Sequence, residues 1–393
     1  MKGSEEENQS RKGSSKVITF TIPNVLETNN ERKISFNESL NRLSKEEIID
    51  KAFRLHLEGN ITEATKYYQY CLDNNFNDPK VLMNYGIILK DLGRLKEAEI
   101  AERKAIELKP DYSYAYLNLG AILKELRLFK EAELFTRKAI ALNPDLVEAY
   151  ANLGSLLHKE DNFKEAEEFL HKAIKLNPKL PALYQILGNI LQGQMKLKEA
   201  EIVTRKAIKM NPNLAEAYVV LGNILLKTGQ VKEAEIQLRK GIELKPDDYD
   251  AIFSLSFMQM LQDDYISGLK NYEARFLRKE FEPDAQPQIP RWYGEGPEKV
   301  EQLLIMNEQG LGDTIHFMRY IPYLRKKGYE VIFSAQKCLH SIIKESGIDS
   351  NPITKQEANQ ITEGKYCPLL SVPLHLGVNQ NNPIVSEPYI STT

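Results

Sequence analysis

One pattern of residues returns every 34 positions through more than half of this 393-residue chain, and it constrains the fold more than any other feature. The segments SYAYLNLGAILKELRLFKEAELFTRKAIALNPDL from Ser113 and VEAYANLGSLLHKEDNFKEAEEFLHKAIKLNPKL from Val147 show it most clearly. The same register runs without insertion over residues 45–248, and a seventh, degraded unit begins at Tyr249. A period of this length indicates an array of stacked helical or strand units.

Three places of each unit hold small or helix-breaking residues. Glycine at the eighth place and alanine at the twentieth let two helices approach closely. Proline at the thirty-second place cannot continue a helix and marks the turn to the next unit. The residues are Gly86, Gly120, Gly154, Gly188 and Gly222, then Ala64, Ala98, Ala132, Ala166, Ala200 and Ala234, and then Pro110, Pro144, Pro178, Pro212 and Pro246.

This pattern resembles the tetratricopeptide repeat, in which W-x2-L-G-x2-Y, A-x3-F and P recur at the same period. The resemblance implies an all-α superhelical solenoid of about seven helix pairs over residues 45–282. Its units are 45–78, 79–112, 113–146, 147–180, 181–214, 215–248 and a degenerate 249–282. Stability then comes from stacking between neighbours, because no unit buries its apolar face alone. Residues 1–44, rich in Lys, Glu, Ser and Asn, are predicted to be a disordered polar tail.

Two charged patterns recur on the second helix of the five units from residue 79 to residue 248. Lys-Glu-Ala is repeated, as at Lys130, Glu131 and Ala132, and a glutamate stands four residues before an arginine, as at Glu133 and Arg137. That spacing gives weak pairs within one helix, worth about 0.2–0.5 kcal/mol each. We interpret this side of the array as a solvated outer face.

Asparagine recurs on the first helix of the units, at the sixth place in three of them and at the ninth in the next two. These places share a helix face because they are three residues apart. In tetratricopeptide superhelices the first helices line a concave groove, so the resemblance implies that this face contacts ligands. The asparagines are Asn84, Asn118, Asn152, Asn189 and Asn223.

An asparagine side chain offers both donors and an acceptor, so a row of them can hold the backbone of an extended peptide. A similar asparagine ladder is a feature of the repeat arm of protein O-linked N-acetylglucosamine transferases. The alternative is that asparagine at the sixth place belongs to the repeat consensus and bonds neighbouring helices. The sequence leaves both interpretations open.

The composition changes after the degraded unit. Four prolines and two glycines in FEPDAQPQIPRWYGEGPEK predict a linker over residues 283–299. Buried-strand patterns at residues 300–308, 329–335 and 366–372 then alternate with helical patterns at 310–328 and 337–347. This alternation predicts βαβ units with a parallel sheet, and hence a small, incomplete α/β Rossmann-like half-domain over residues 300–393.

Three blocks of this segment resemble the acceptor-side half of GT-B glycosyltransferases, a group found fused behind tetratricopeptide repeats in bacteria and related to heptosyltransferases. The blocks are residues 268–276, then 308–314 with 319–320, and then 367–374. In heptosyltransferase-like enzymes the aspartate of the matching Gly-Asp pair is proposed as the general base. The resemblance therefore implies that role for Asp313, with Gly310 and Gly312 in the acceptor-side loop.

The alternative for Asp313 is an N-cap that accepts hydrogen bonds from the first helical turn. His316, one turn later, is interpreted as an exposed or satisfied histidine. A complete GT-B enzyme also needs a second Rossmann-like domain with the nucleotide-sugar site, and the 111 residues from Pro283 hold one partial domain. We therefore expect no activity from this chain alone, because no residues remain to stabilise a departing nucleotide.

Composition excludes several other classes of function. Lys plus Arg number 52 against 55 Asp plus Glu, so no overall field of the chain favours nucleic acid or anionic membrane. Cys71, Cys338 and Cys367 share no metal-ligand spacing and are predicted to be free thiols in a reducing compartment, so no metal site is expected. No apolar run has the length of a signal peptide or a membrane span, which predicts a cytoplasmic protein.

The sequence thus predicts a protein-interaction scaffold that binds an extended peptide or protein segment in its concave groove. The second hypothesis is a protein O-linked glycosyltransferase, similar to O-linked N-acetylglucosamine transferases, whose nucleotide-sugar half is missing. No cofactor is expected, and a nucleotide sugar would enter only if a separately encoded C-terminal half supplied that site.

Overall fold

The computed structural model describes residues 40, 43–278, 287–300, 302–308, 310–379, 381–382 and 389–390. The chain divides into two compact units, residues 1–178 and 179–393. Nearly all of the predicted tail and the start of the predicted linker lie outside the described residues.

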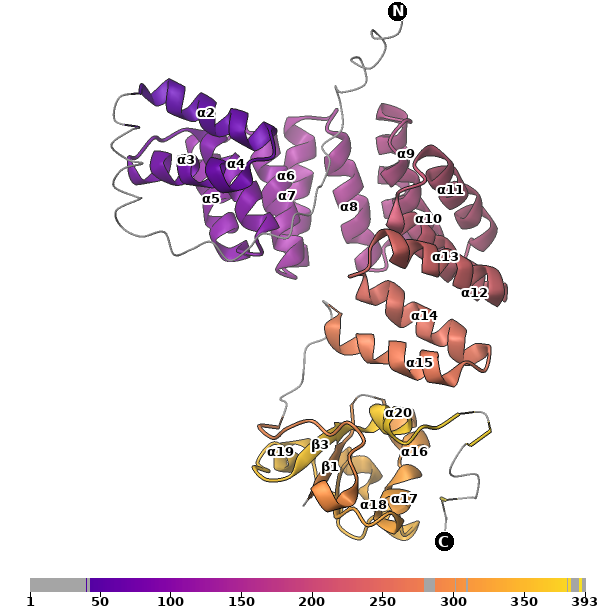
Figure 1. Cartoon of the computed structure of the whole chain (residues 1–393). Helices are drawn as coiled ribbons and strands as arrows, with labels where there is room; N and C mark the ends of the chain where they lie inside the picture. Colours follow the sequence, from indigo (N-terminus) through magenta and orange to yellow (C-terminus); the bar gives the residue numbers. More distant parts are fainter. Residues whose placement is uncertain are drawn as a thin grey trace, which may run out of the picture. The chain divides into compact units, whose positions relative to one another are not determined.

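The described part of the first unit contains four helix pairs, each joined by a tight turn (Figure 1). The pairs are α2 (Lys45–Leu57) with α3 (Ile61–Asp73), α4 (Pro79–Asp91) with α5 (Leu95–Leu108), α6 (Ser113–Glu125) with α7 (Phe129–Leu142), and α8 (Val147–Lys159) with α9 (Phe163–Leu176). A capping box starts α2: the Glu47 amide donates to Ser44 Oγ at 3.2 Å, and the Ser44 amide donates to the Glu47 carboxylate at 2.8 Å.

The second unit begins with three more pairs and therefore continues the repeat. They are α10 (Pro181–Gly193) with α11 (Leu197–Met210), α12 (Ala215–Lys227) with α13 (Val231–Leu244), and α14 (Tyr249–Leu261) with the shorter α15 (Tyr265–Tyr272), which leads into the 3-10 helix η1 (Glu273–Leu277). The predicted all-α solenoid of about seven helix pairs is thus confirmed.

The eighth-place glycines lie where the two helices of a pair come closest. A Cβ built on Gly222 would lie 2.7 Å from Leu238 Cγ and 3.1 Å from the Ala234 carbonyl oxygen.

A second glycine preference arises at the fifteenth place, between the helices, where the backbone is left-handed. There Gly93 has φ 75° and Met195 has φ 60°, so a side chain is tolerated but disfavoured.

A small α/β region follows in the same unit (Figure 1). Its three strands pair in parallel in the order β2–β1–β3, with Ile305 between Phe333 and Cys367. The elements are β1 (Leu303–Met306), α16 (Leu311–Phe317), α17 (Tyr320–Lys326), β2 (Val331–Ser334), η3 (Lys337–Leu339), α18 (His340–Glu345), α19 (Lys355–Ala358), β3 (Lys365–Pro368), η4 (Leu369–Ser371) and α20 (Val372–His375). The predicted parallel sheet with intervening helices is confirmed, and its identity as a Rossmann-like half-domain stays a prediction.

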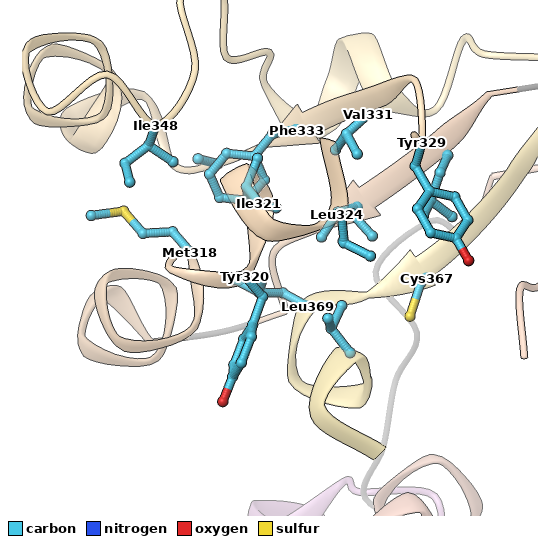
Figure 2. Close-up of a cluster of buried hydrophobic side chains, with 14 of the residues drawn as sticks. Met318, Tyr320, Ile321, Leu324, Tyr329, Val331, Phe333, Ile348, Cys367 and Leu369 are labelled. Atoms are coloured by element: carbon cyan, nitrogen blue, oxygen red, sulfur yellow. The ribbon is translucent and has the colours of Figure 1, made fainter. Parts of the chain in front are cut away.

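Apolar side chains from both the helices and the strands form the core of this region. Figure 2 shows Ile321 and Leu324 of α17 near Phe333 of β2 and Leu369 of η4, all of them buried. Trp292, which lies inside the predicted linker, is 0% exposed and belongs to the same core. Residues 287–299 therefore cover the sheet, although their prolines and glycines disfavour regular secondary structure.

Several predicted elements differ in extent from the observed ones, and the first two strands are shorter at both ends. The third strand was expected to reach Val372 but ends at Pro368, because the chain turns there into η4 and then into α20, which has a proline in its first turn. The helical pattern over residues 310–328 forms two short helices, α16 and α17, separated by Met318 and Arg319.

Candidate functional site

The five predicted asparagines all lie half-buried on the first helices of their pairs, but their partners differ. We call the surface formed by the non-core places of the first helices the first-helix face. Asn84 Nδ2 donates to the Lys80 carbonyl oxygen of its own helix at 2.8 Å. Asn118 Nδ2 donates to Glu102 Oε1 of the preceding pair at 3.1 Å. The contact of Asn118 therefore matches the alternative interpretation, in which the asparagine bonds a neighbouring helix.

The other three asparagines have free side-chain amides. Asn152 of α8 makes no hydrogen bond to the described part of its unit, and the same holds for Asn189 of α10 and Asn223 of α12. A half-buried amide without a protein partner retains all of its donors and its acceptor for a ligand or for water. These three residues are therefore the members of the row that are available for binding.

Glu102 is a buried carboxyl group whose burial was not predicted from the sequence. It is 0% exposed, its Oε1 accepts from Asn118, and its Oε2 has no partner among the described residues. Burial raises the pKa of Glu102 well above its usual range, against smaller opposing effects of Asn118 and Lys90. Its place, the twenty-fourth, carries no charge in the other units, where it is Tyr68, Thr136, Leu170, Thr204, Leu238 or Tyr272. A charged residue at a place that is uncharged in every other unit was the signal in the sequence that could have identified Glu102.

We expect the stability of the first unit to fall as the pH rises. The folded state raises the pKa of Glu102 above 4.5, so the folded state binds the proton more tightly than the unfolded chain does. The stabilisation is complete below 4.5 and is lost as the pH rises through the folded pKa, by about 1.4 kcal/mol per pH unit. Urea unfolding at a series of pH values measures this slope. Glu102→Gln should flatten the slope, and an unchanged slope would show that Glu102 ionises freely.

Asn118→Ala and Asn152→Ala should differ in their effect on stability. Asn118→Ala removes the hydrogen bond to buried Glu102 and should lower the free energy of unfolding by about 1–3 kcal/mol. Asn152→Ala breaks no described hydrogen bond and should change it by less than about 0.5 kcal/mol. Thermal unfolding followed by circular dichroism compares the two variants, and equal losses would contradict the different roles assigned to them.

The charged patterns of the second helices join into ion pairs between consecutive pairs. Arg137 contacts Glu133 of its own helix at 2.7 Å and Glu165 of the next pair at 2.8 Å. Arg205 bridges Glu201 and Glu233 in the same way, both at 2.7–2.8 Å. These side chains are 25–44% exposed, so such pairs contribute at most about 1 kcal/mol each. They support stacking and leave the first-helix face as the candidate binding surface.

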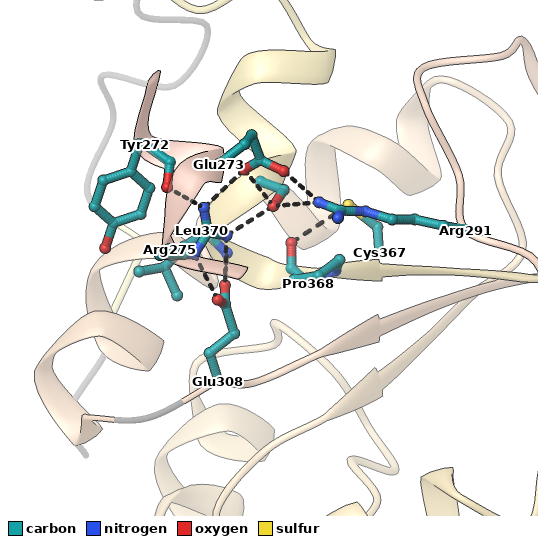
Figure 3. A network of polar contacts seen from close by, with 9 residues as sticks. Tyr272, Glu273, Arg275, Arg291, Glu308, Cys367, Pro368 and Leu370 are labelled. Carbon is teal, nitrogen blue, oxygen red and sulfur yellow. Dashed lines mark hydrogen bonds and ion pairs between the residues drawn. The ribbon is translucent and has the colours of Figure 1, made fainter. Parts of the chain in front are cut away.

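A second polar cluster joins the last repeat to the α/β region (Figure 3). The Arg275 side chain is 8% exposed. Its Nε and one terminal nitrogen donate to the two oxygens of Glu308 at 2.8 and 3.1 Å. The other terminal nitrogen donates to Glu273 at 2.7 Å and to the Tyr272 carbonyl oxygen at 3.1 Å. The terminal nitrogen that contacts Glu308 also donates to Ser371 Oγ at 2.8 Å. The guanidinium group of Arg275 thus donates five hydrogen bonds, one for each of its N–H groups.

The rest of the cluster balances its charge. Arg291 donates to Glu273 and to Ser371 Oγ, and Leu370 donates its amide to Glu308 at 3.0 Å. Burial alone would raise the pKa of Glu273, but Arg275, Ser371 and Arg291 together hold that pKa below its usual value. Two arginines face two glutamates, and nearly every polar atom is satisfied. The cluster therefore fixes η1 against η4 and against Glu308, which follows the end of β1.

The three blocks that carry the glycosyltransferase resemblance meet at this cluster. Glu273 and Arg275 come from the first block, Glu308 from the second, and Leu370 and Ser371 from the third. Residues up to 98 positions apart in sequence are brought together in this way. The sequence identified the blocks but gave no sign that they contact one another.

Asp313 lies just outside the cluster, in the first turn of α16. Its side chain is exposed, and the N-cap position belongs to Gly310, so Asp313 is not the N-cap residue that the alternative interpretation required. A Cβ on Gly310 would lie 2.7 Å from Asp313 Oδ2, whereas Gly312 faces open space. His316 follows one turn later; burial and then Arg319 lower its pKa, although Asp313 opposes them. Arg319 Nη2 also lies 3.3 Å from His316 Nδ1, so the imidazole ring has a partner.

The described part of the chain contains no group of three or more His, Cys, Asp or Glu side chains arranged to hold a metal ion. Among the same residues no helix is long and apolar enough to cross a membrane. Cys71 and Cys367 are buried free thiols, and burial raises the pKa of each.

Comparisons with known proteins identify the repeats. Residues 79–112, 113–146, 147–180 and 203–236 match family models of the tetratricopeptide repeat. No protein of curated function matches the chain. The fold is similar to a chain of the APC/C hetero-tetramer Cut9–Hcn1, at 16% identity and a TM-score of 0.53, over 57% of this chain and 45% of that one. It is also similar to a tetratricopeptide repeat protein from Parabacteroides merdae, at 17% identity and a TM-score of 0.51, over 61% of this chain and 94% of that one.

Proposed function

We propose that this array of tetratricopeptide repeats is an interaction scaffold that binds an extended segment of another protein along its first-helix face. The observation that carries the proposal is the pair of free, half-buried amides of Asn189 and Asn223 in the second unit, and Asn152 is the corresponding free amide of the first unit. Each amide can accept from a peptide N–H and donate to a peptide carbonyl, which holds the backbone of a ligand without selecting its side chains. Arg103, Arg137 and Arg205 of the second helices are instead engaged in ion pairs with the next repeat.

Selection from a random peptide library, followed by photo-crosslinking, tests this function. A selected peptide that carries a benzophenone group should crosslink to residues of α8, α10 and α12. A crosslink confined to the second helices α9, α11 and α13 would contradict the proposal, as would failure of the library to yield any specific ligand. Mass spectrometry of the crosslinked fragments separates these outcomes because each helix lies in its own proteolytic fragment.

A second candidate function is the acceptor half of a glycosyltransferase, with Asp313 as the general base and Gly310 and Gly312 in the acceptor-side loop. The meeting of the three resemblance blocks at Arg275 favours it, because resemblance confined to unconnected surface segments would have no such contact. Calorimetric titration with a nucleotide sugar such as UDP-N-acetylglucosamine tests the assignment. Binding would support an enzyme and contradict a scaffold without catalytic function. Clean absence would contradict a nucleotide-sugar site in this chain and leave only an acceptor half that depends on a separately encoded C-terminal half.

A further inference from the structure

The first-helix face of residues 1–178 carries a row of basic residues that the asparagines do not explain. The twelfth place of its four units holds histidine or lysine, whereas the same place in residues 179–393 holds no charge. The residues are His56, Lys90, Lys124 and His158 in the first unit, against Gln192, Leu226 and Met260 in the second. The basic row is therefore a property of one unit and not of the repeat as such.

Lys124, in the middle of this row, has no counter-ion. Its side chain is half-buried and makes no ion pair with any carboxylate among the described residues. The lysines around it are engaged: Lys90 pairs with Asp91 at 3.3 Å, and Lys159 lies over the Phe129 ring at 5.9 Å from its centroid. Helices α4 and α8, which carry these two lysines, both pack against α6.

The surroundings of Lys124 disfavour its positive charge. Burial lowers the pKa of Lys124, the positive charges of Lys159 and Lys90 lower it further, and Glu125 opposes them. A desolvated charge without a partner costs stability, and an anion placed against it recovers part of that cost. The ammonium would then form a charge-assisted hydrogen bond, which is about twice as strong as a neutral one.

We propose that Lys124, flanked by Lys90 and Lys159, binds a carboxylate of an acidic segment in the partner protein. This inference rests on the proposed scaffold function and names the chemistry of the bound segment. Asn152 and Lys159 are seven residues apart on α8, so an amide and an ammonium lie on one helix face. An acidic peptide could therefore be held through its backbone and its side chain together.

An acidic polypeptide fits this surface better than a nucleic acid does. Asp91 and Glu125 lie directly beside the lysines in sequence, and Asp91 is paired with Lys90. The closely spaced phosphates of a nucleic acid would meet these carboxylates, whereas single carboxylates spaced along a peptide can avoid them. The chain also carries no overall positive charge to attract a polyanion, its formal net charge being -3.

Fluorescence anisotropy with defined peptides tests the proposal on the full chain. A labelled peptide of alternating glutamate and glycine should bind about tenfold or more tightly than its glutamine counterpart, because a charged hydrogen bond contributes about 1.5–3 kcal/mol. The difference should shrink as salt is added. Equal affinities for the two peptides would overturn the inference, as would tighter binding of a single-stranded oligonucleotide than of the glutamate peptide.

The variant Lys124→Met should weaken selective binding and increase thermal stability. It should abolish the preference for glutamate over glutamine and also raise the midpoint of thermal unfolding, because an unpaired, half-buried charge is removed. Lys130→Met, which removes the same charge from an exposed position on α7, should leave both quantities unchanged. Loss of stability in Lys124→Met without loss of the preference would contradict a binding role.

The library-selected peptide separates this inference from the proposed function. If that peptide crosslinks to the first helices while the glutamate peptide shows no preference, the scaffold function stands and the acidic specificity is wrong. If neither the selected peptide nor the glutamate peptide binds, both proposals are wrong.

Discussion

Replacing Arg275 with methionine should lower the free energy of unfolding of the α/β region by about 3–5 kcal/mol. The guanidinium is nearly fully buried and neutralises Glu308 and Glu273, so its removal leaves carboxylates in a desolvated cluster without enough positive charge. Trp292 is the single tryptophan of the chain and lies in the core of this region, so its fluorescence reports the transition selectively. Urea unfolding followed by that fluorescence measures the loss.

Two further variants test whether the loss comes from uncompensated charge. Arg275→Met combined with Glu308→Gln should recover part of the stability, because the carboxylate that lost its partner is neutralised as well. Arg278→Met changes an arginine that pairs with exposed Asp250 and should cost at most about 1 kcal/mol. A loss of similar size in Arg275→Met and Arg278→Met would contradict the structural role assigned to the cluster.

Replacing Gly222 with alanine should destabilise the second unit by about 1–3 kcal/mol, although alanine is the better helix former by about 1 kcal/mol. The new Cβ would lie 2.7 Å from Leu238 Cγ, and Leu238 is 0% exposed and cannot move away. The helices of the pair must separate instead. Far-UV circular dichroism during thermal unfolding measures the change.

The contact between Gly222 and Leu238 can be tested by a double-mutant cycle. Leu238→Ala alone leaves a cavity, and adding Gly222→Ala to it should cost less than it does in the original chain, because only the 3.1 Å contact with the Ala234 carbonyl oxygen remains. Equal effects of Gly222→Ala in the presence and absence of Leu238 would show that close helix packing does not select this glycine. A gain in stability from Gly222→Ala alone would show the same.

The helix pairs were predictable because their determinants repeat and lie close together in sequence. Gly222 and Leu238 are sixteen positions apart, and each unit repeats the same relation between the eighth and twenty-fourth places. The parallel sheet was predictable in outline from alternating apolar runs. Its strand ends were not, because Pro368 and the turn into η4 override the apolar character of the residues that follow.

Neither buried Glu102 nor the buried cluster around Arg275 was predicted, for different reasons. Glu102 stands in the sequence Ala-Glu-Arg-Lys and looks like an ordinary surface charge until its place is compared across the units. Arg275 meets Glu308 and Ser371 only through the tertiary fold, at separations of 33 and 96 residues. Likewise the row of five asparagines was visible in sequence, but the partner that occupies Asn118 was not.

The central claim is that the free asparagine amides of the first-helix face hold a peptide ligand. The most direct measurement is the affinity of the library-selected peptide for the triple variant of Asn152→Ala, Asn189→Ala and Asn223→Ala, with thermal unfolding recorded on the same sample. We predict an affinity loss of about tenfold or more, since each amide contributes about 0.5–1.5 kcal/mol, and an unchanged unfolding midpoint. Unchanged affinity, or a lowered midpoint that accounts for weaker binding, would contradict the claim.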